Sequence, residues 1–291
     1  MRSHGCQTMF APLARVIVKR PDEAFGSADP ATWNYRSRPN LGAARAEHDA
    51  FVAILERAGA EIVYQDTPEL DSADAIYVHD PSIVTDEGAV LLNMGKVLRR
   101  DEPTAVERTY EQLGVPILGR LSGNAWAEGG DLLWIDHDTL AVGQGFRTNV
   151  LGLARLADLL APLGVKTLPV ELPYFEGPEV CLHLMSLISI VDRDLAVVYS
   201  RLLSLPFRNE LERRGFTLVE VVDDEFVSMG TNVLATAPRH CVMLERNPVT
   251  RSRLERAGCV VEVYEGDEIS HKGEGGPTCL TRPLLRAKIS A

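Results

Sequence analysis

Short apolar runs alternate with amphipathic stretches along most of this chain. The runs LARVIVK (13–19) and EIVY (61–64) predict buried strands, because they are short, apolar and rich in β-branched residues. Between them, residues 41–58 carry apolar positions at helical spacing, and Gly59 ends that pattern. The first part of the chain therefore predicts a strand, a helix and a second strand.

The same alternation continues to the C-terminus. Strands are predicted at 75–84, 89–94, 115–118, 131–136, 139–143, 165–170, 182–191, 195–199, 217–222, 231–237, 240–244 and 260–265. Helices are predicted at 102–113, 149–161 (with Thr148 as N-cap), 206–214 and 249–257.

A strand–strand–helix–strand unit thus recurs about five times along the chain. This period comes from pattern and not from sequence identity, and a generic α/β sandwich would give a similar alternation. No low-complexity segment, linker or shift in composition divides the chain, so we expect a single α/β domain over residues 1–291.

Composition and charge narrow the class of partner. The chain is 45% hydrophobic and 24% charged, as is usual for globular proteins, and its formal net charge is −11. That charge argues against nucleic acid and against an anionic membrane surface. No apolar run approaches the roughly 20 residues of a membrane span, and the N-terminus has no signal-peptide pattern. We therefore expect a small-molecule partner and neither nucleic acid nor membrane.

The five cysteines are widely spaced, odd in number and free of any CxxC pair. This pattern indicates reduced thiols in a cytoplasmic protein, not a disulfide framework. Cys279 stands apart, because it follows three glycines and a proline in GEGGPTCL. Such a stretch can hold one side chain at an open position, so Cys279 is either a nucleophile or a small apolar filler.

Three carboxylates lie near turn residues. Glu128 precedes two glycines in AEGGD, where it either points into a cleft or belongs to a solvated β-turn. Asp74 and Asp80 flank an apolar stretch in DAIYVHDPSIV, and their even separation would place both on one face of a continuous strand. The alternative for Asp80 is a turn at the following Pro81.

An imidazole and a guanidinium complete the candidate chemistry. His183 lies in an apolar run, as a core histidine would, but beside a thiol it could act as general acid and base. Arg147, in GQGFRTN, either clamps a carboxylate or is solvated beside a capping threonine. There is no HExxH and no Cys/His quartet, so no zinc site is expected. Several carboxylates together suit a planar cation such as guanidinium.

The order of six motifs resembles that of the guanidine-modifying enzymes, which include arginine deiminases, dimethylarginine dimethylaminohydrolases and amidinotransferases. The resemblance runs from about residue 12 to residue 286. The motifs are YVHDPSIV, AEGGD, GFRTN, HLMS, GTNVL and GEGGPTCL. It implies the pentein fold, a five-bladed α/β propeller of ββαβ modules with the active site in its central channel. It also implies covalent catalysis without a metal or a cofactor.

The resemblance assigns roles by motif. It makes Cys279 the nucleophile and His183 the general acid and base. Glu128 then orients His183 or holds the substrate, Asp80 binds the guanidinium, and Arg147 is placed to hold a substrate carboxylate. Family members often pair, so a homodimer or higher homo-oligomer is expected.

Two departures from the related families bear on the substrate. The deiminases and amidinotransferases resemble each other in having an acidic residue at the position where this chain has Met185. Asp74 fits the position of the second carboxylate with which the dimethylaminohydrolases bind their substrate. The resemblance to the dimethylaminohydrolases also implies an arginine that helps to bind the substrate carboxylate, in the stretch LLNMG. This chain offers Asn93 there, and Arg99 or Arg100 are the candidate replacements.

The best match is therefore a dimethylaminohydrolase-like hydrolase. It would attack the guanidinium carbon of arginine, methylated arginine or a related guanidino compound, and release a ureido product such as citrulline. An amidinotransferase, an arginine deiminase or dihydrolase, and a non-catalytic binding protein of the same fold are the alternatives. Residues 22–40 are aromatic and loop-like, and they are the candidate lid.

Overall fold

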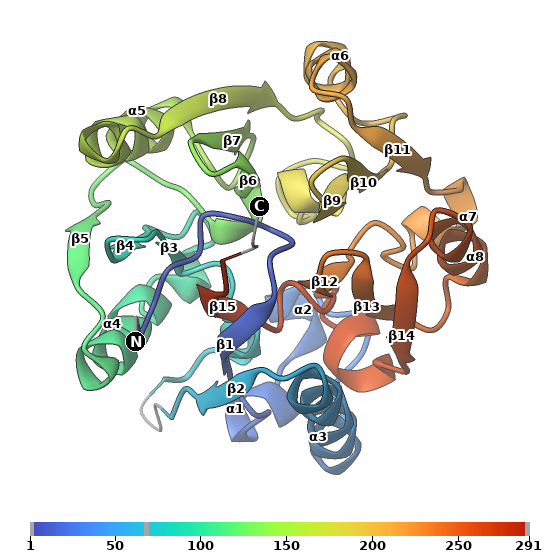
Figure 1. Ribbon diagram of the computed structural model, residues 1–291. Coiled ribbons are helices and arrows are strands. Elements are labelled where there is room, and N and C mark those ends of the chain that lie inside the picture. Colours follow the sequence, from blue (N-terminus) through green and yellow to red (C-terminus); the bar gives the residue numbers. More distant parts are fainter. Residues whose placement is uncertain (1–2, 67–69, 289–291) are drawn as a thin grey trace.

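Five small sheets form a ring in the computed structural model, which describes residues 3–66 and 70–288 (Figure 1). Each sheet has three strands, and its middle strand pairs antiparallel with one neighbour and parallel with the other. The strand orders are β15-β1-β2, β3-β4-β5, β6-β7-β8, β11-β10-β9 and β12-β13-β14. The five-fold repeat predicted from the hydrophobic pattern is confirmed.

Four modules run continuously along the chain, each as two antiparallel strands, a helix and a parallel strand. Their strands are β3 (Ser82–Val84), β4 (Ala89–Leu91), β5 (Ile117–Arg120), β6 (Leu132–Asp136), β7 (Thr139–Gln144), β8 (Lys166–Glu171), β9 (Ile188–Asp192), β10 (Leu195–Val198), β11 (Thr217–Glu220), β12 (Leu234–Ala237), β13 (His240–Leu244) and β14 (Val260–Tyr264). Their helices are α4 (Glu102–Leu113), α5 (Val150–Leu160), α6 (Leu205–Arg213) and α8 (Pro248–Arg256).

The remaining module is built from both ends of the chain. Strand β1 (Leu13–Val18) pairs in parallel with β2 (Glu61–Tyr64), and helix α3 (Leu41–Arg57) connects them. The third strand is β15 (Arg282–Arg286), which pairs antiparallel with β1 and so closes the ring. This closure ties the segment just before β15 to the middle of the fold.

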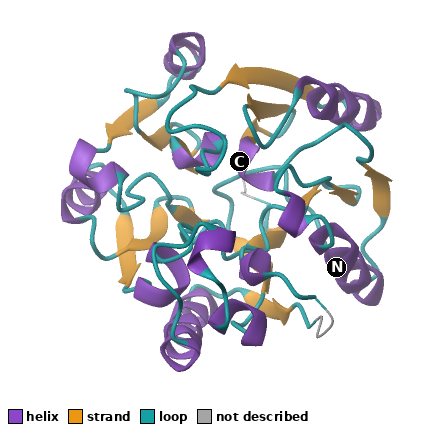
Figure 2. Cartoon of the chain, turned by 180° about the vertical axis from the view of Figure 1, so that it is seen from behind, coloured by secondary structure: helices purple, strands orange, loops and turns teal. Residues whose placement is uncertain are grey.

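Helices lie on the outside of the ring and strands on the inside, as the view from behind also shows (Figure 2). Helix α3 illustrates the reason, because Ala44, Phe51 and Leu55 recur at helical spacing and are fully buried. Burying a side chain of the size of Leu or Phe contributes about 1.5–3 kcal/mol. Each outer helix is thus held to its sheet by one apolar face.

The rest of the regular structure is short. It comprises α1 (Glu23–Gly26), α2 (Pro30–Trp33), α7 (Asp223–Phe226), a π-helix (Asp267–His271) and 3-10 turns at Ala73–Ile76, Val97–Arg99, Gly129–Asp131, Ala161–Leu163 and Leu184–Ser186. In the ranges described, no helix is both long enough and apolar enough to cross a bilayer.

Three sequence predictions were wrong in detail. Only Ser82–Val84 of the predicted strand 75–84 is extended, because a 3-10 turn and a turn before Pro81 precede it. A 3-10 turn likewise replaces the first part of the strand predicted at 182–191. The N-cap of α5 is Asn149, whose side chain accepts the Gly152 N–H at 2.8 Å, and not Thr148. Asn149 takes the capping place because its side-chain oxygen satisfies a backbone N–H of the first helical turn.

Candidate active site

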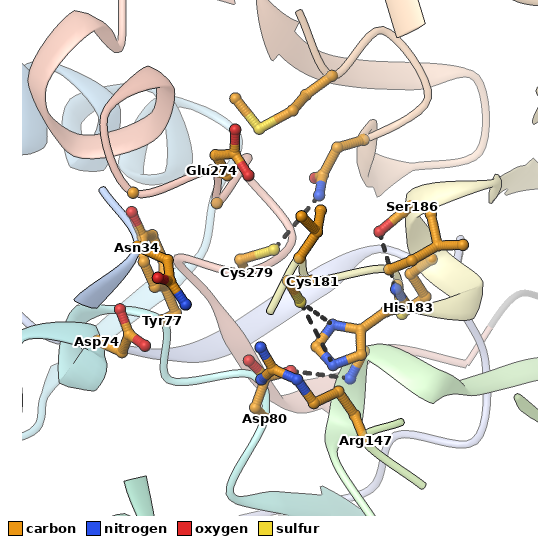
Figure 3. Close-up of a pocket in the computed structure, with 18 of the residues that line it drawn as sticks. Asn34, Asp74, Tyr77, Asp80, Arg147, Cys181, His183, Ser186, Glu274 and Cys279 are labelled. Atoms are coloured by element: carbon orange, nitrogen blue, oxygen red, sulfur yellow. Dashed lines mark hydrogen bonds between the residues drawn. The ribbon is translucent and has the colours of Figure 1, made fainter. Parts of the chain in front are cut away.

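A cavity of about 370 Å³ is lined by residues of all five modules. The lining includes five of the residues predicted from the sequence (Figure 3): Asp74, Asp80, Arg147, His183 and Cys279. Trp33, Asn34 and Arg36, from the segment predicted as a lid, also line it. The ring thus gathers residues that are far apart in the sequence.

The imidazole of His183 is held by a buried carboxylate. His183 Nε2 lies 2.8 Å from Oε2 of Glu128, which is fully buried. Gly130 makes room for the ring, because a Cβ added there would lie 2.3 Å from His183 Nδ1. The second glycine of AEGGD therefore allows the close approach of the imidazole to the backbone. With Nε2 bound to Glu128, Nδ1 is the nitrogen left for proton transfer.

Glu128 has two further partners. Its Oε2 accepts a hydrogen bond from Arg147 Nη1 at 3.1 Å, and its Oε1 accepts one from the backbone N–H of Lys96 at 3.0 Å. Burial alone would raise the pKa of Glu128, but the Arg147 guanidinium and the His183 imidazole hold it well below its usual value. Glu128 is therefore an anion that orients His183.

The pKa of His183 reflects these surroundings. Burial by itself would lower it, but negative charge at Cys181, Asp131 and Asp80 raises it well above its usual value. Asp131 also anchors the backbone, since its Oδ1 accepts the Leu184 N–H at 2.9 Å. His183 is thus an imidazolium in this site at neutral pH, and it has a proton to donate.

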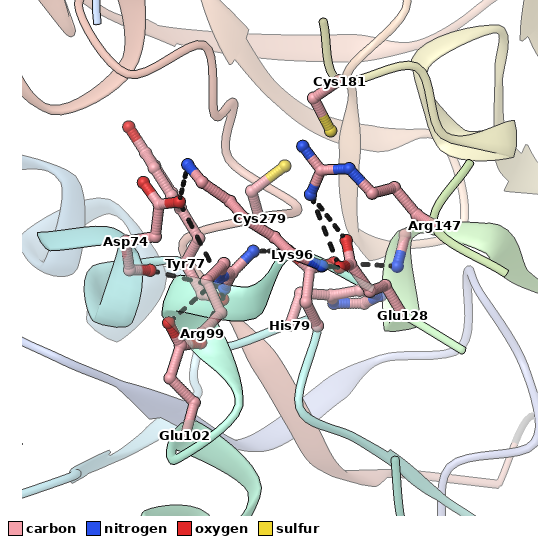
Figure 4. Close-up of polar contacts among 12 residues, drawn as sticks. Asp74, Tyr77, His79, Lys96, Arg99, Glu102, Glu128, Arg147, Cys181 and Cys279 are labelled. Carbon is pink, nitrogen blue, oxygen red and sulfur yellow. Dashed lines mark hydrogen bonds and ion pairs between the residues drawn. The ribbon is translucent and has the colours of Figure 1, made fainter. Parts of the chain in front are cut away.

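Asp80 and Asp74 both pair with the buried Arg99, and Figure 4 shows Asp74 and Arg99. Arg99 Nη1 donates to Asp80 Oδ2 at 2.6 Å, and its other nitrogens donate to Glu102 at 2.8 and 2.9 Å. Burial by itself would raise the pKa of Asp80, but the charges of Arg99 and His183 act together against it and lower that pKa. The backbone N–H of Gly130 donates to Asp80 Oδ1 at 2.9 Å. The two carboxylates share a site through Arg99, not through a common strand.

Asp74 faces a second cation of the chain. Lys96 Nζ lies 2.6 Å from its Oδ2, and the Tyr35 hydroxyl donates to its Oδ1 at 2.9 Å. The same Lys96 Nζ donates to the Trp33 carbonyl at 3.0 Å and lies over the Trp33 ring, 5.1 Å from its centroid. Lys96 lines the cavity, so a substrate cation that approaches Asp74 meets this ammonium group.

Cys279 is partly exposed to the cavity and has an amide as its partner. Asn232 Nδ2 lies 3.4 Å from its Sγ, and Asn232 Oδ1 accepts the N–H of Thr278 at 3.0 Å. Burial and the charge of Asp80 raise the pKa of the Cys279 thiol to about 11. The thiol is therefore neutral before a substrate binds, and a bound cation would have to lower its pKa.

Asn93 does not face the cavity. Its Nδ2 donates to the carbonyls of Gly123 and Ala125, both at 3.0 Å, and it is absent from the lining residues described. Of its two candidate replacements, Arg99 is saturated by carboxylates and Arg100 lies over the Trp126 ring. A direct contact of Asn93 with substrate is therefore not supported, because its amide nitrogen already donates to two backbone carbonyls.

Sequence reasoning assigned no role to Asn232, Lys96 or Cys181. Asn232 lies in GTNVL, which counted only as part of the motif order. Cys181 precedes His183 by two positions, a spacing that in extended backbone places both side chains on one face. Lys96 gives no local signal, because its importance comes from the distant Asp74.

One group of side chains has the composition of a metal site. Ligand atoms of Asp80, Glu128 and His183 lie within 4.8 Å of one another. Guanidinium groups already neutralise both carboxylates, Arg99 at Asp80 and Arg147 at Glu128. A divalent cation there would have to compete with these two guanidinium groups for the carboxylate oxygens.

The motif order agrees with a comparison to known families. A family model described as N,N dimethylarginine dimethylhydrolase, eukaryotic, matches residues 30–286. The chain belongs to this family. The match to this family, the ring of five modules and the similarity to a solved structure together confirm the pentein fold.

Relatives and solved structures cover nearly the whole chain. The uncharacterized protein YkgA of Bacillus subtilis is 26% identical over 287 residues, which is 97% of this chain and 96% of YkgA. The N(G),N(G)-dimethylarginine dimethylaminohydrolase of Pseudomonas aeruginosa is 23% identical, over 91% of this chain and 97% of that enzyme. The solved structure of a mutant of the Pseudomonas enzyme, complexed with citrulline, matches with a TM-score of 0.77 at 21% identity, over 93% of this chain and 98% of that one.

The fold is shared with a transferase. SxtG, an amidinotransferase of Microseira wollei, matches with a TM-score of 0.81 at 14% identity, over 99% of this chain and 98% of that one. At this identity the likeness concerns the fold alone. The chain is thus a pentein related to enzymes that modify guanidino groups, and the particular reaction has to be argued from its own site.

Proposed function

We propose that this protein hydrolyses the guanidinium group of arginine, a methylated arginine or a related guanidino compound through a covalent intermediate on Cys279. The observation that carries the proposal is the meeting of a thiol, an imidazolium and two carboxylates in one cavity. These four groups, Cys279, His183, Asp80 and Asp74, all line the cavity. Cys279 is the nucleophile, His183 the general acid and base, and Glu128 the residue that positions His183.

The first half of the reaction forms the intermediate. Burial and the charge of Asp80 raise the pKa of Cys279, and binding of the substrate cation between Asp80 and Asp74 offsets that charge, so the thiol loses its proton to solvent. The thiolate then bonds to the guanidinium carbon. His183 Nδ1 gives its proton to the departing nitrogen, the carbon–nitrogen bond breaks, and ammonia or an amine leaves. A thiouronium remains on Cys279.

The second half restores the enzyme. His183 is now neutral and takes a proton from water, whose oxygen bonds to the thiouronium carbon. The carbon–sulfur bond breaks, the oxygen gives up its second proton, and a neutral ureido product leaves the Cys279 thiolate, which takes up a proton to restore the thiol. His183 has then regained the proton that it gave to the departing nitrogen, and it is an imidazolium again. No metal or cofactor takes part in this proposal.

The rim of the cavity bears on the substrate tail. Glu176, Glu179 and Glu274 are exposed and line the cavity, whereas Arg36 is paired with Glu274 at 3.0 Å. An acidic rim raises the local concentration of cations. Arg147 is the remaining group proposed to hold a substrate carboxylate. Guanidines with a neutral or cationic tail therefore belong in any substrate test beside the amino acids.

The test is a turnover screen of the purified protein with arginine, mono- and dimethylarginine, agmatine and several guanidino acids. Ureido product is assayed, with Cys279→Ser as the control, and this variant is expected to lose turnover at least about 1,000-fold. Citrulline from methylated arginines would support the dimethylargininase activity. Undiminished turnover by Cys279→Ser would overturn the assignment of the nucleophile.

The same screen bears on two further candidate functions, amidino transfer and binding without catalysis. An amidinotransferase would need an amine acceptor, so the screen is repeated with glycine and lysine if no ureido product forms. Met185, in place of the acid expected for transferases and deiminases, favours hydrolysis of substituted guanidines. A non-catalytic binding protein would bind guanidines and leave Cys279 inert to an amidine-type alkylating reagent.

Assembly and compartment stay predictions. We propose a homodimer or higher homo-oligomer in the cytoplasm, where thiols stay reduced. All five cysteines are free thiols in the structure, which is compatible with that compartment. Sedimentation of the purified protein measures the assembly.

A further inference from the structure

A second thiol lines the same cavity and lies closer to the imidazole than the proposed nucleophile does. Cys181 Sγ is 3.5 Å from His183 Nδ1 and 3.8 Å from Nε2, and the side chain is partly exposed (Figure 3). Among the residues described, Cys279 has a hydrogen bond to Asn232 and none to His183. The atom that the mechanism uses for proton transfer, Nδ1, therefore faces Cys181 in the free protein.

The charges around the two thiols differ. Cys181 lies near two cationic groups, since its Sγ is 3.5 Å from His183 Nδ1 and Arg147 lines the same cavity. Cys279 has the carboxylate of Asp80 near it, and its pKa is raised to about 11. A thiolate is the reactive form of cysteine, and nearby cations favour it. The surroundings of Cys181 therefore favour the reactive form of a cysteine, and those of Cys279 in the free protein do not.

We propose that Cys181 is a second reactive thiol and the first site that neutral electrophiles modify in the substrate-free protein. The thiol proton leaves to solvent, and the thiolate, held 3.5 Å from the imidazolium Nδ1 of His183, attacks the electrophilic carbon. With iodoacetamide, a sulfur–carbon bond forms, the carbon–iodine bond breaks and iodide leaves. This assignment rests on the contact with His183 and does not depend on the proposed guanidine chemistry.

Modification at Cys181 also has a consequence for the site. The adduct lies in the cavity beside His183 Nδ1, where a departing nitrogen must accept its proton. It therefore blocks the general acid and leaves the Cys279 thiol chemically intact. Cys181 becomes a point at which electrophiles switch off the site without touching the nucleophile.

The experiment measures site-resolved alkylation by mass spectrometry without substrate at neutral pH. Iodoacetamide is expected to label Cys181 at least about ten-fold faster than Cys279, as a thiolate reacts faster than a thiol. Cys279→Ala should leave the Cys181 rate unchanged. His183→Asn should lower that rate about ten-fold, and Arg147→Met, which keeps the imidazole, should lower it less. Cys241 is buried and serves as the unreactive internal reference.

Two outcomes would overturn the inference: faster labelling of Cys279 than of Cys181, or an unchanged Cys181 rate in folded His183→Asn protein. Circular dichroism establishes that each variant is folded before labelling. A parallel arm uses 2-chloroacetamidine, a cationic reagent that should label Cys279 if guanidinium binding activates it. If that reagent spares Cys279 while iodoacetamide still labels Cys181, the proposed function fails and the inference stands.

Discussion

Two buried groups of ion pairs lie side by side at the cavity, and they are built from the same kinds of side chain with opposite charge balance (Figure 4). The Arg99 group consists of three carboxylates and two cations: Asp74, Asp80, Glu102, Lys96 and Arg99. The Glu128 group consists of one carboxylate between two cationic side chains: Glu128, Arg147 and His183. The first has an excess of negative charge, and the second an excess of positive charge.

This difference shows how one kind of interaction serves two purposes. The excess negative charge of the Arg99 group leaves acceptor capacity for a cation, because a carboxylate offers about four lone-pair sites. The excess positive charge of the Glu128 group keeps a proton on His183. Buried ion pairs add little stability by themselves, so their charge balance is more informative about function than their number.

Glu128→Gln should give the largest effect on the Glu128 group. The substitution keeps the shape but removes the charge that orients His183 and balances Arg147, so kcat is expected to fall about 1,000-fold. Steady-state kinetics on the best substrate of the screen measures it. Glu107→Gln is the matched control, since Glu107 pairs with Arg120 outside the cavity, and its kcat should be unchanged. A loss confined to KM would refute the division between the groups.

Asp80→Asn should act on binding more than on the chemical step. It removes a charged hydrogen-bond acceptor worth about 1.5–3 kcal/mol, which corresponds to a rise in KM of roughly 10–150-fold. The comparison variant is Glu102→Gln, because Glu102 is buried against the same Arg99 and does not line the cavity. Thermal unfolding should show Glu102→Gln as destabilised, with little change in KM. Equal changes in KM for both variants would contradict the proposed subsite.

Lys96→Met should improve binding of a guanidinium. The ammonium of Lys96 occupies Asp74 Oδ2 and repels an incoming cation, so its removal is expected to lower KM about three- to ten-fold. Lys272→Met is the control, because Lys272 pairs with Glu268 and does not line the cavity. A rise in KM would instead show that Lys96 holds a part of the substrate.

Asp131→Asn should give the smallest effect, a shift in the pH profile. Burial raises the pKa of Asp131 to about 6, so it is ionised above that pH and then raises the pKa of His183. Its removal lowers the pKa of His183, and the alkaline limb of kcat should move to lower pH by about one unit. Below pH 6 the variant should match the parent. Asp136→Asn, at an exposed pair with Arg214, should leave the profile unchanged.

Much of the fold was predictable because periodicity is a local property. The predicted helices at 41–58 and 102–113 match α3 and α4 to within one residue. The split first module was not visible in the pattern, since β1 and β15 lie at opposite ends of the chain. The strand predicted at 75–84 failed because Asp74 and Asp80 take their geometry from the distant Arg99.

The amino-acid sequence by itself determined the five-fold alternation and, through its motif order, the family and the candidate residues Cys279, His183 and Glu128. The tertiary structure alone decided which groups contact one another. Glu128 and His183 are 55 residues apart in the sequence and form a hydrogen bond, Asn93 donates to a backbone carbonyl, and Cys181 lies against the imidazole of His183. The physical reason is distance and burial. Side-chain periodicity depends on neighbours a few residues away, whereas charge balance depends on groups that only folding brings together and removes from water.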